Sequence, residues 1–156
     1  MDLLGLAQNM EGLMPGVVRP LCADFSFMAD NAPFPPDFDL GGFHFHSNST
    51  SQWFANATAA EIGLQFFDQG AEIDLPTSVS EVKMRIGTFA GRVDIQALNS
   101  AGATVANVVV PGTNSYQDIA VRGIDMVKLS LNGGGNEGIL VRACVDVTIC
   151  SPESKT

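Results

Sequence analysis

The sequence is poor in basic residues. It has eight Lys and Arg against seventeen Asp and Glu, which gives a formal net charge of −9 at pH 7. Nucleic acids and anionic membrane surfaces are bound by basic proteins, so this balance argues against both as partners. It leaves cations, neutral ligands and other protein chains as partners that the charge permits.

Long apolar runs and a recognisable export signal are also missing. No run approaches the ~20 apolar residues that a membrane-spanning helix needs. The chain begins Met-Asp-Leu-Leu, has no basic segment near its start and carries Glu11, unlike a secretory signal. Either the protein is not exported by that route or an initiator Met has replaced a signal, and the sequence leaves both open.

Motifs of the common hydrolases are absent. The sequence contains no Gly-x-Ser-x-Gly and no His-Glu-x-x-His, and its three cysteines lack zinc-site spacing. Carboxylates are abundant, yet no pair stands out as the acid and base of a glycosidase. We therefore predict a protein that is not an enzyme.

Apolar and glycine residues are plentiful, and they indicate a sheet protein. Hydrophobic residues make up 46% of the chain, with ten Phe and sixteen Gly. The most regular stretch, 126–150, has two alternating runs around the turn Gly133-Gly-Gly, where we expect positive φ angles. In its second run one face is apolar and should lie in the core: Ile139, Val141, Ala143, Val145, Val147 and Ile149.

The rest of the chain is predicted to be a series of short strands. Residues 1–16 are the exception, because apolar residues recur there at helical spacing before Pro15-Gly16. Proline-rich residues 29–40 should form a long irregular loop. Strands are expected at 17–27, 42–46, 61–67, 71–75, 79–86, 92–98, 103–110, 116–121, 126–131 and 139–149. Among the turns predicted between them are Leu75-Pro76 and Arg122-Gly123-Ile124-Asp125. The predicted fold is all-β: a single jelly-roll-like β-sandwich over 17–150, with a short N-terminal helical arm and a tail at 151–156.

Several segments resemble the jelly-roll domains of bacterial extracellular proteins, which are similar to galactose-binding-like and carbohydrate-binding modules. The segments are Cys22-Ala-Asp-Phe, Val82-Lys-Met-Arg-Ile-Gly-Thr-Phe-Ala-Gly, Ile95-Gln-Ala-Leu-Asn-Ser-Ala-Gly-Ala-Thr-Val-Ala and Gly133-Gly-Gly-Asn-Glu-Gly-Ile-Leu-Val. The resemblance covers residues 20–150 and implies a non-catalytic extracellular or cell-surface module whose ligand is a glycan.

Four side chains are candidates for ligand binding. Trp53 and Tyr116 are the single residues of their kinds, and sugar sites use such rings as stacking platforms. Packing in the core or at its rim explains either ring equally well. His44 and His46 project from one face of a strand at a spacing that can share a metal. We expect Asp37 and Asp39 to be distant across a loop, which leaves no third ligand nearby, so two solvent-facing histidines are the simpler interpretation.

A calcium ion is the one cofactor that the sequence suggests. Asn136 and Glu137 carry side-chain oxygens beside the glycine turn, and oxygen ligands are what Ca²⁺ prefers. The domains that the sequence resembles often hold such a structural ion. The spacing matches no defined calcium loop, so a solvated Glu137 is the alternative.

The cysteines allow one sharp prediction. Cys144 and Cys150 share a strand and would lie about 20 Å apart, too far for a disulfide. If strands 21–27 and 139–149 are antiparallel neighbours, Cys22 opposite Cys144 also sets Asp24 opposite Arg142, an opposite-charge pair. We therefore predict Cys22–Cys144 in an oxidising compartment, with Cys150 free or linking chains.

A second function remains possible from the sequence. A structural subunit could assemble into a filament, fibre or surface coat through the apolar N-terminal arm and exposed sheet edges. Such a subunit would be a homo-oligomer, whereas a binding module would stay monomeric.

Overall fold

The computed structural model describes residues 17–149, and every regular element among them is a β-strand. About 70% of these residues are in strands, so the all-β prediction is confirmed. No helix long and apolar enough to span a membrane occurs in this part of the chain. The strands are β1 (Val17–Asp24), β2 (Pro33–Phe34), β3 (Asp37–Leu40), β4 (Phe43–Ser47), β5 (Trp53–Thr58), β6 (Glu61–Phe66), β7 (Ala71–Thr88), β8 (Val93–Asn99), β9 (Thr104–Val110), β10 (Tyr116–Gly133) and β11 (Gly138–Ile149).

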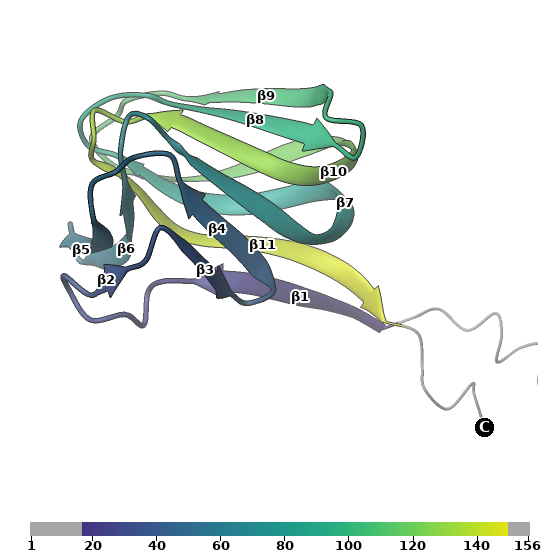
Figure 1. The fold of residues 1–156 in the computed structure, drawn as a ribbon, viewed down its shortest axis with the longest axis horizontal. Coiled ribbons are helices and arrows are strands. Elements are labelled where there is room, and N and C mark those ends of the chain that lie inside the picture. The colour runs from purple at the N-terminus through teal and green to yellow at the C-terminus, as the bar shows by residue number, and fades with distance from the viewer. Residues whose placement is uncertain (1–16, 150–156) are drawn as a thin grey trace, which may run out of the picture.

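Two long strands, β7 and β10, connect the two layers of the molecule. They pair with each other from Tyr116 opposite Gly87 to Leu131 opposite Ala71. On its other side β7 pairs first with β4 and then with β11. One layer therefore holds β3, β4, the start of β7, the end of β10, β8 and β9. The other holds β2, β5, β6, β1, β11 and the remaining halves of β7 and β10 (Figure 1).

Alternating apolar side chains from both layers meet in one core. Val82, Met84 and Ile86 of β7 point inward, while the residues between them point outward, as the period of a strand requires. The predicted inner face of β11 is confirmed where it is described. Its residues Ile139, Val141, Ala143 and Val145 are all at most 2% exposed.

An aromatic cluster fills one end of the core. The Phe25 ring lies 5.3 Å from Phe45 and 6.1 Å from Phe38, both edge to face, and Phe38 stacks on Phe45 at 5.0 Å. Phe38 belongs to β3, inside the segment 29–40 that we expected to be an irregular loop. That expectation was wrong, because Asp-Phe-Asp-Leu alternates and pairs with β4 despite the prolines before it.

The tight β3–β4 turn depends on glycine. Gly41 has φ +62°, and a Cβ built there would lie 2.1 Å from the carbonyl oxygen of Cys22. Any larger residue would push β1 away from the hairpin. The glycine run predicted to turn the chain before β11 does so, since Gly133, Gly134 and Gly135 all have positive φ.

Two predicted turns are instead bends inside continuous strands. Leu75-Pro76 lies within β7, and Arg122–Asp125 lies within β10, where the register shifts and Asp125 has φ +60°. Proline and glycine at these points bend the strands from one layer to the other rather than ending them.

The predicted arm 1–16, Cys150 and the tail 151–156 lie outside the described residues.

Candidate functional site

The outer surface of the layer that contains β11 carries a ladder of polar side chains, which we call the polar face. Its members are Cys22, Asp24, Glu81, Lys83, Arg85, Asp118, Arg122, Arg142, Cys144 and Asp146, with Ala120 among them as the one apolar residue. The strand registers arrange them in rows across β1, β11, β7 and β10. One row reads Asp24, Arg142, Arg85, Asp118, and the next reads Cys22, Cys144, Lys83, Ala120. In the first row opposite charges meet at both ends, Asp24 with Arg142 and Arg85 with Asp118, while the two arginines are neighbours in the middle. The opposite-charge pairs stabilise the sheet and give the face its polarity.

A disulfide between Cys22 and Cys144 fixes β1 to β11, as the sequence predicted. The two residues are directly opposite each other, with Cα atoms 4.1 Å apart, and Asp24 lies opposite Arg142 in the same register. The amide of Phe25 donates to the carbonyl of Val141, so the cysteines occupy a non-hydrogen-bonded pair, where side chains approach most closely. The bond therefore fits the pleat of the sheet at this position.

Arg85 is the centre of the ion pairs on the polar face. Its Nε and Nη2 donate to the two carboxylate oxygens of Glu61 at 2.8 and 2.6 Å, and its Nη1 lies 3.1 Å from Asp118. The Arg85 guanidinium holds the pKa of Glu61 below its usual range, and Glu61 in turn raises the pKa of Arg85. A bidentate pair of this kind fixes β6 against β7.

Tyr116 lies beneath this network rather than on an open surface. The Arg85 guanidinium is 5.5 Å from the centre of its ring, and its hydroxyl donates to the carbonyl of Thr58 at 2.7 Å. Burial, followed by the charge of Glu61, raises the pKa of Tyr116 to about 12. The ring is partly buried and already in contact with Arg85 and Phe89, so it serves as a packing residue in this structure.

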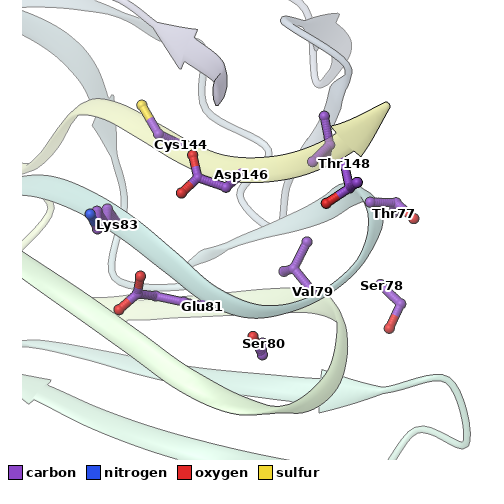
Figure 2. A pocket seen from close by; sticks show the side chains of 10 residues that line it. Thr77, Ser78, Val79, Ser80, Glu81, Lys83, Cys144, Asp146 and Thr148 are labelled. Carbon is purple, nitrogen blue, oxygen red and sulfur yellow. The ribbon is translucent and has the colours of Figure 1, made fainter. Parts of the chain in front are cut away.

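A groove opens where β7 and β11 separate. Their pairing ends at Lys83 opposite Cys144, because β11 continues beside β1 while β7 crosses to the other layer. The groove has a volume of about 500 Å³, and Figure 2 shows Lys83 and Cys144 at one end with Thr77 and Thr148 at the other. The complete lining is Thr77, Ser78, Val79, Ser80, Glu81, Lys83, Cys144, Asp146, Val147 and Thr148.

The groove presents hydrogen-bonding groups of every kind. Its side chains supply hydroxyls, two carboxylates and one ammonium group. The backbone of β11 adds amide and carbonyl groups. The carbonyl of Val141 faces β1, and successive residues of a strand direct their backbone groups to opposite sides, so the amides and carbonyls of Asp146 and Thr148 face the groove. A shallower depression of about 450 Å³ adjoins it through Lys83 and Cys144, and reaches Asp118 and Arg142. The lining suits a ligand with many hydroxyl groups.

The two candidate histidines lie on the opposite surface of the molecule, on β4. His44 Nδ1 is 2.7 Å from Asp39 and its Nε2 is 3.2 Å from Asp37, while His46 Nδ1 is 2.8 Å from Asp37. Asp39, then Asp37, raises the pKa of His44, and the pKa of Asp37 is lowered chiefly by His46. These aspartates are on β3, directly beside the histidines, and not distant across a loop.

This arrangement is a ladder of ion pairs between β3 and β4. Among residues 17–149, no three His, Cys, Asp or Glu are arranged to hold a metal ion. Because β4 belongs to the other layer, the structure does not bring the histidines together with the groove or with Tyr116. Their role as ligand-binding residues stays a prediction.

Trp53 is in the core. Its side chain is 1% exposed, its ring lies 5.4 Å from Phe38, and its indole nitrogen donates to the carbonyl of Pro35 at 2.6 Å. This placement agrees with the packing alternative that the sequence left open. A sugar could stack on the ring only if the surrounding core opened.

Asn136 and Glu137 lie in the turn before β11, away from the groove. Asn136 is held in the turn, since its side-chain oxygen accepts from the amide of Asp68 and its own amide donates to the Asp68 carboxylate. Its carbonyl accepts from Gln65 at 3.0 Å. Glu137 is exposed. Calcium binding here stays a prediction.

Sequence reasoning missed the groove and one exposed ring. The groove depends on β7 bending away from β11, and the local signal for it, Pro76 within an alternating run, was interpreted as a turn. A strand that reached residue 27 would put Phe27 on the same face as Phe25, which is buried. Phe27 is instead 87% exposed, because β1 ends at Asp24, where the carboxylate accepts from the amide of Ser26. The available signal was an aspartate at the strand end, whose side chain can accept from the amide two residues later.

No protein-family model matches the sequence, and no curated protein matches it either. Solved structures do resemble the fold. A family 29 carbohydrate-binding module aligns with a TM-score of 0.50 and 9% identity over 86% of this chain and 92% of its own. A family 29 module in complex with cellulohexaose gives 0.49 and 8% over 88% and 95%, and a family 6 module gives 0.43 and 13% over 67% and 86%. The predicted resemblance to carbohydrate-binding modules is confirmed as a similarity of fold.

Proposed function

We propose that this protein is a non-catalytic, extracellular glycan-binding module whose site is the groove between β7 and β11. The observation that carries the proposal is the groove itself, with its Ser, Thr, Asp, Glu and Lys side chains along two diverging strands. Its volume of about 500 Å³ is within the usual range for small-ligand sites, ~300–1,000 Å³.

The lining favours a neutral sugar over an apolar or strongly charged ligand. Hydroxyls and carboxylates can accept and donate to adjacent sugar hydroxyls, while Lys83 donates only. Glu81 is already paired with Arg122 at 2.7 Å, which leaves Asp146 as the more available carboxylate. A net protein charge of −9 disfavours polyanionic chains over neutral ones.

The affinity is expected to be weak. No aromatic side chain lines the groove, so the apolar stacking that strengthens many sugar sites is missing there. Each exposed hydrogen bond contributes about 0.5–1.5 kcal/mol net. The net free energy of several such hydrogen bonds, after the cost of association is subtracted, corresponds to a Kd of about 1 mM.

Two further observations support the proposal. The fold is shared with a family 29 carbohydrate-binding module, although an identity of 9% transfers no site residue. The Cys22–Cys144 disulfide suits an oxidising compartment, in keeping with a location outside the cell.

A binding assay with matched variants tests the proposal. Calorimetry or affinity electrophoresis against neutral oligosaccharides and polysaccharides should detect a ligand for the wild type. Asp146→Asn and Thr148→Val change groove side chains that are exposed, so the fold should persist and affinity should fall several-fold. Gln96→Ala, an exposed change on β8 in the other layer, is the control. Equal binding by all four proteins would place the ligand elsewhere.

A further inference from the structure

β9 is the last strand of the first layer. It pairs antiparallel with β8 from Thr104 opposite Leu98 to Val110 opposite Val93, and within residues 17–149 it pairs with no other strand. One side of its backbone therefore presents amide and carbonyl groups that no described strand satisfies. Such an edge is a template for another chain.

Proteins usually protect edges of this kind with charge, proline or short length. The other terminal strands here follow that rule. β1 carries Pro20 and Asp24, β2 is two residues long and contains Pro33, and β3 carries aspartates. β9 has no charge or proline, since residues 97–117 contain no Asp, Glu, Lys or Arg and its sequence is Thr-Val-Ala-Asn-Val-Val-Val. A bulge at Val105 disturbs only its start, and residues 106–110 pair with β8 in an unbroken register.

The outer surface of the strand carries no charged side chain. Val109 is 57% exposed, and Asn107 beside it on the same surface is exposed. The nearest charge on β8 is Asp94, opposite Val109, and Arg92 lies 3.4 Å from its carboxylate. The surroundings of β9 are therefore close to neutral in a chain whose net charge is −9.

The sequence of β9 is complementary to itself about Asn107. In an antiparallel pair of two copies centred there, Asn107 faces its own counterpart, Val105 faces Val109, and Ala106 faces Val108. Ala106 and Val108 pack against the core, so the apolar inner surfaces of the two layers become continuous, while half-buried Val105 also packs against the core and leaves Val109 as the exposed valine. The two central amides can hydrogen-bond to each other across the symmetry axis.

We propose that β9 pairs with β9 of a second copy of this chain, joining two sandwiches through one continuous layer. Charge supports a second copy over other partners of this edge, because two chains of net charge −9 can approach most closely where neither carries charge. Seven residues give a contact about 24 Å long, which is small for a stable interface. The dimer should therefore be reversible and form at high protein concentration.

Sedimentation equilibrium of the full chain over a wide concentration range tests this pairing. The mean mass of the wild type should rise toward that of a dimer. Asn107→Lys sets two lysines against each other at the symmetry axis and should shift dimerisation to at least tenfold higher concentration. Gln96→Lys is the matched control, since Gln96 is exposed and lies opposite Asn107 one strand further in, and it adds the same charge.

Hydrogen exchange supplies a second measurement that does not depend on any variant. Amides of β9 should exchange more slowly as wild-type concentration rises, while those of β3, another terminal strand, should not change. A wild type that remains monomeric throughout, or one that associates equally as Asn107→Lys and Gln96→Lys, would overturn the proposal. Association without slower exchange in β9 would place the contact on another surface.

Discussion

Asp24 and Arg142 lie opposite each other on β1 and β11, two residue pairs along from the disulfide between Cys22 and Cys144. This register follows from the sequence, because placing the two cysteines opposite each other determines every other pair on the two strands. The consequence extends beyond β1. The disulfide holds β11 along the wall of the groove at the point where β7 separates from it.

The disulfide should contribute strongly to stability. It closes a loop with a sequence separation of 122 residues, for which chain entropy predicts about 4–5 kcal/mol, although strain and residual structure often reduce this. The double variant Cys22→Ala with Cys144→Ala should unfold at lower urea concentration by an amount worth about 2–5 kcal/mol.

Peptide mapping without reduction checks the pairing itself. It should recover a peptide that links residues 22 and 144. Cys150→Ser is the control, and its unfolding should match that of the wild type. An unchanged midpoint in the double variant would mean that β1 is held by its pairing with β11 alone.

The Glu61–Arg85 pair should matter more than a surface ion pair. Both side chains are less than one-third exposed, at 30% and 23%, and the pair is bidentate. Arg85→Lys retains the positive charge but cannot make the two parallel hydrogen bonds to Glu61, so we expect a loss of about 1–2 kcal/mol in unfolding free energy. Arg122→Lys, at a pair whose arginine is 73% exposed, should cost less than 0.5 kcal/mol. Equal losses measured by urea unfolding would contradict this ranking.

The pH dependence of the β3–β4 hairpin follows from His44. Its pKa is raised above the ordinary 6.5 by Asp39 and then Asp37, so protonated His44 stabilises the folded state. That contribution is complete below pH 6.5 and is lost as pH rises through the folded-state pKa. The contribution of Asp37 to stability changes with pH in the opposite direction. Because the pKa of Asp37 is lowered in the folded state, its contribution is lost as pH falls below 3.8.

An NMR titration of the His44 ring measures this directly. Asp39→Asn should lower the pKa of His44 toward 6.5, whereas Asp146→Asn, an exposed change on the other layer, should leave it unchanged. A wild-type His44 that titrates at or below 6.5 would show that the aspartates do not pair with it in solution.

A substitution of Trp53 distinguishes a role in the core from a role in glycan binding. Its ring is buried, so Trp53→Phe should lower the unfolding free energy by about 1–3 kcal/mol through lost volume and the unpaired Pro35 carbonyl. Glycan affinity should not change, provided that binding is measured well below the melting temperature. Loss of binding in a folded Trp53→Phe protein would instead support the stacking role that the sequence suggested.

Local patterns predicted the class of the fold better than its long-range geometry. The alternation in 139–149 was enough to place β11 and its inner face. Its pairing with β1 was assumed, and the cysteines then gave the register of that pair, which the structure has. The same alternation could not show that β7 and β10 each pass through both layers, because a bend at Pro76 and a turn there have the same local sequence signal.

The candidate site was mostly beyond reach for a related reason. Trp53 is buried against Phe38 of β3, and His44 pairs with Asp39 of β3. Both contacts require β3 to be a strand, and the prolines around it concealed that strand in the sequence. Groove residues such as Ser80 and Thr148 belong to strands that are distant in sequence. No spacing rule connects them until the crossing of β7 is known.

Mapping of a bound sugar by NMR tests the central claim most directly. With a neutral oligosaccharide identified by the binding assay, backbone amide shifts should change for Ser80, Asp146 and Thr148, and they should saturate together at about millimolar ligand. Amides of His44 and Gln96 on the other layer should not move. Shifts confined to that other layer, or to the loop that carries Phe27, would contradict the assignment of the groove as the glycan site.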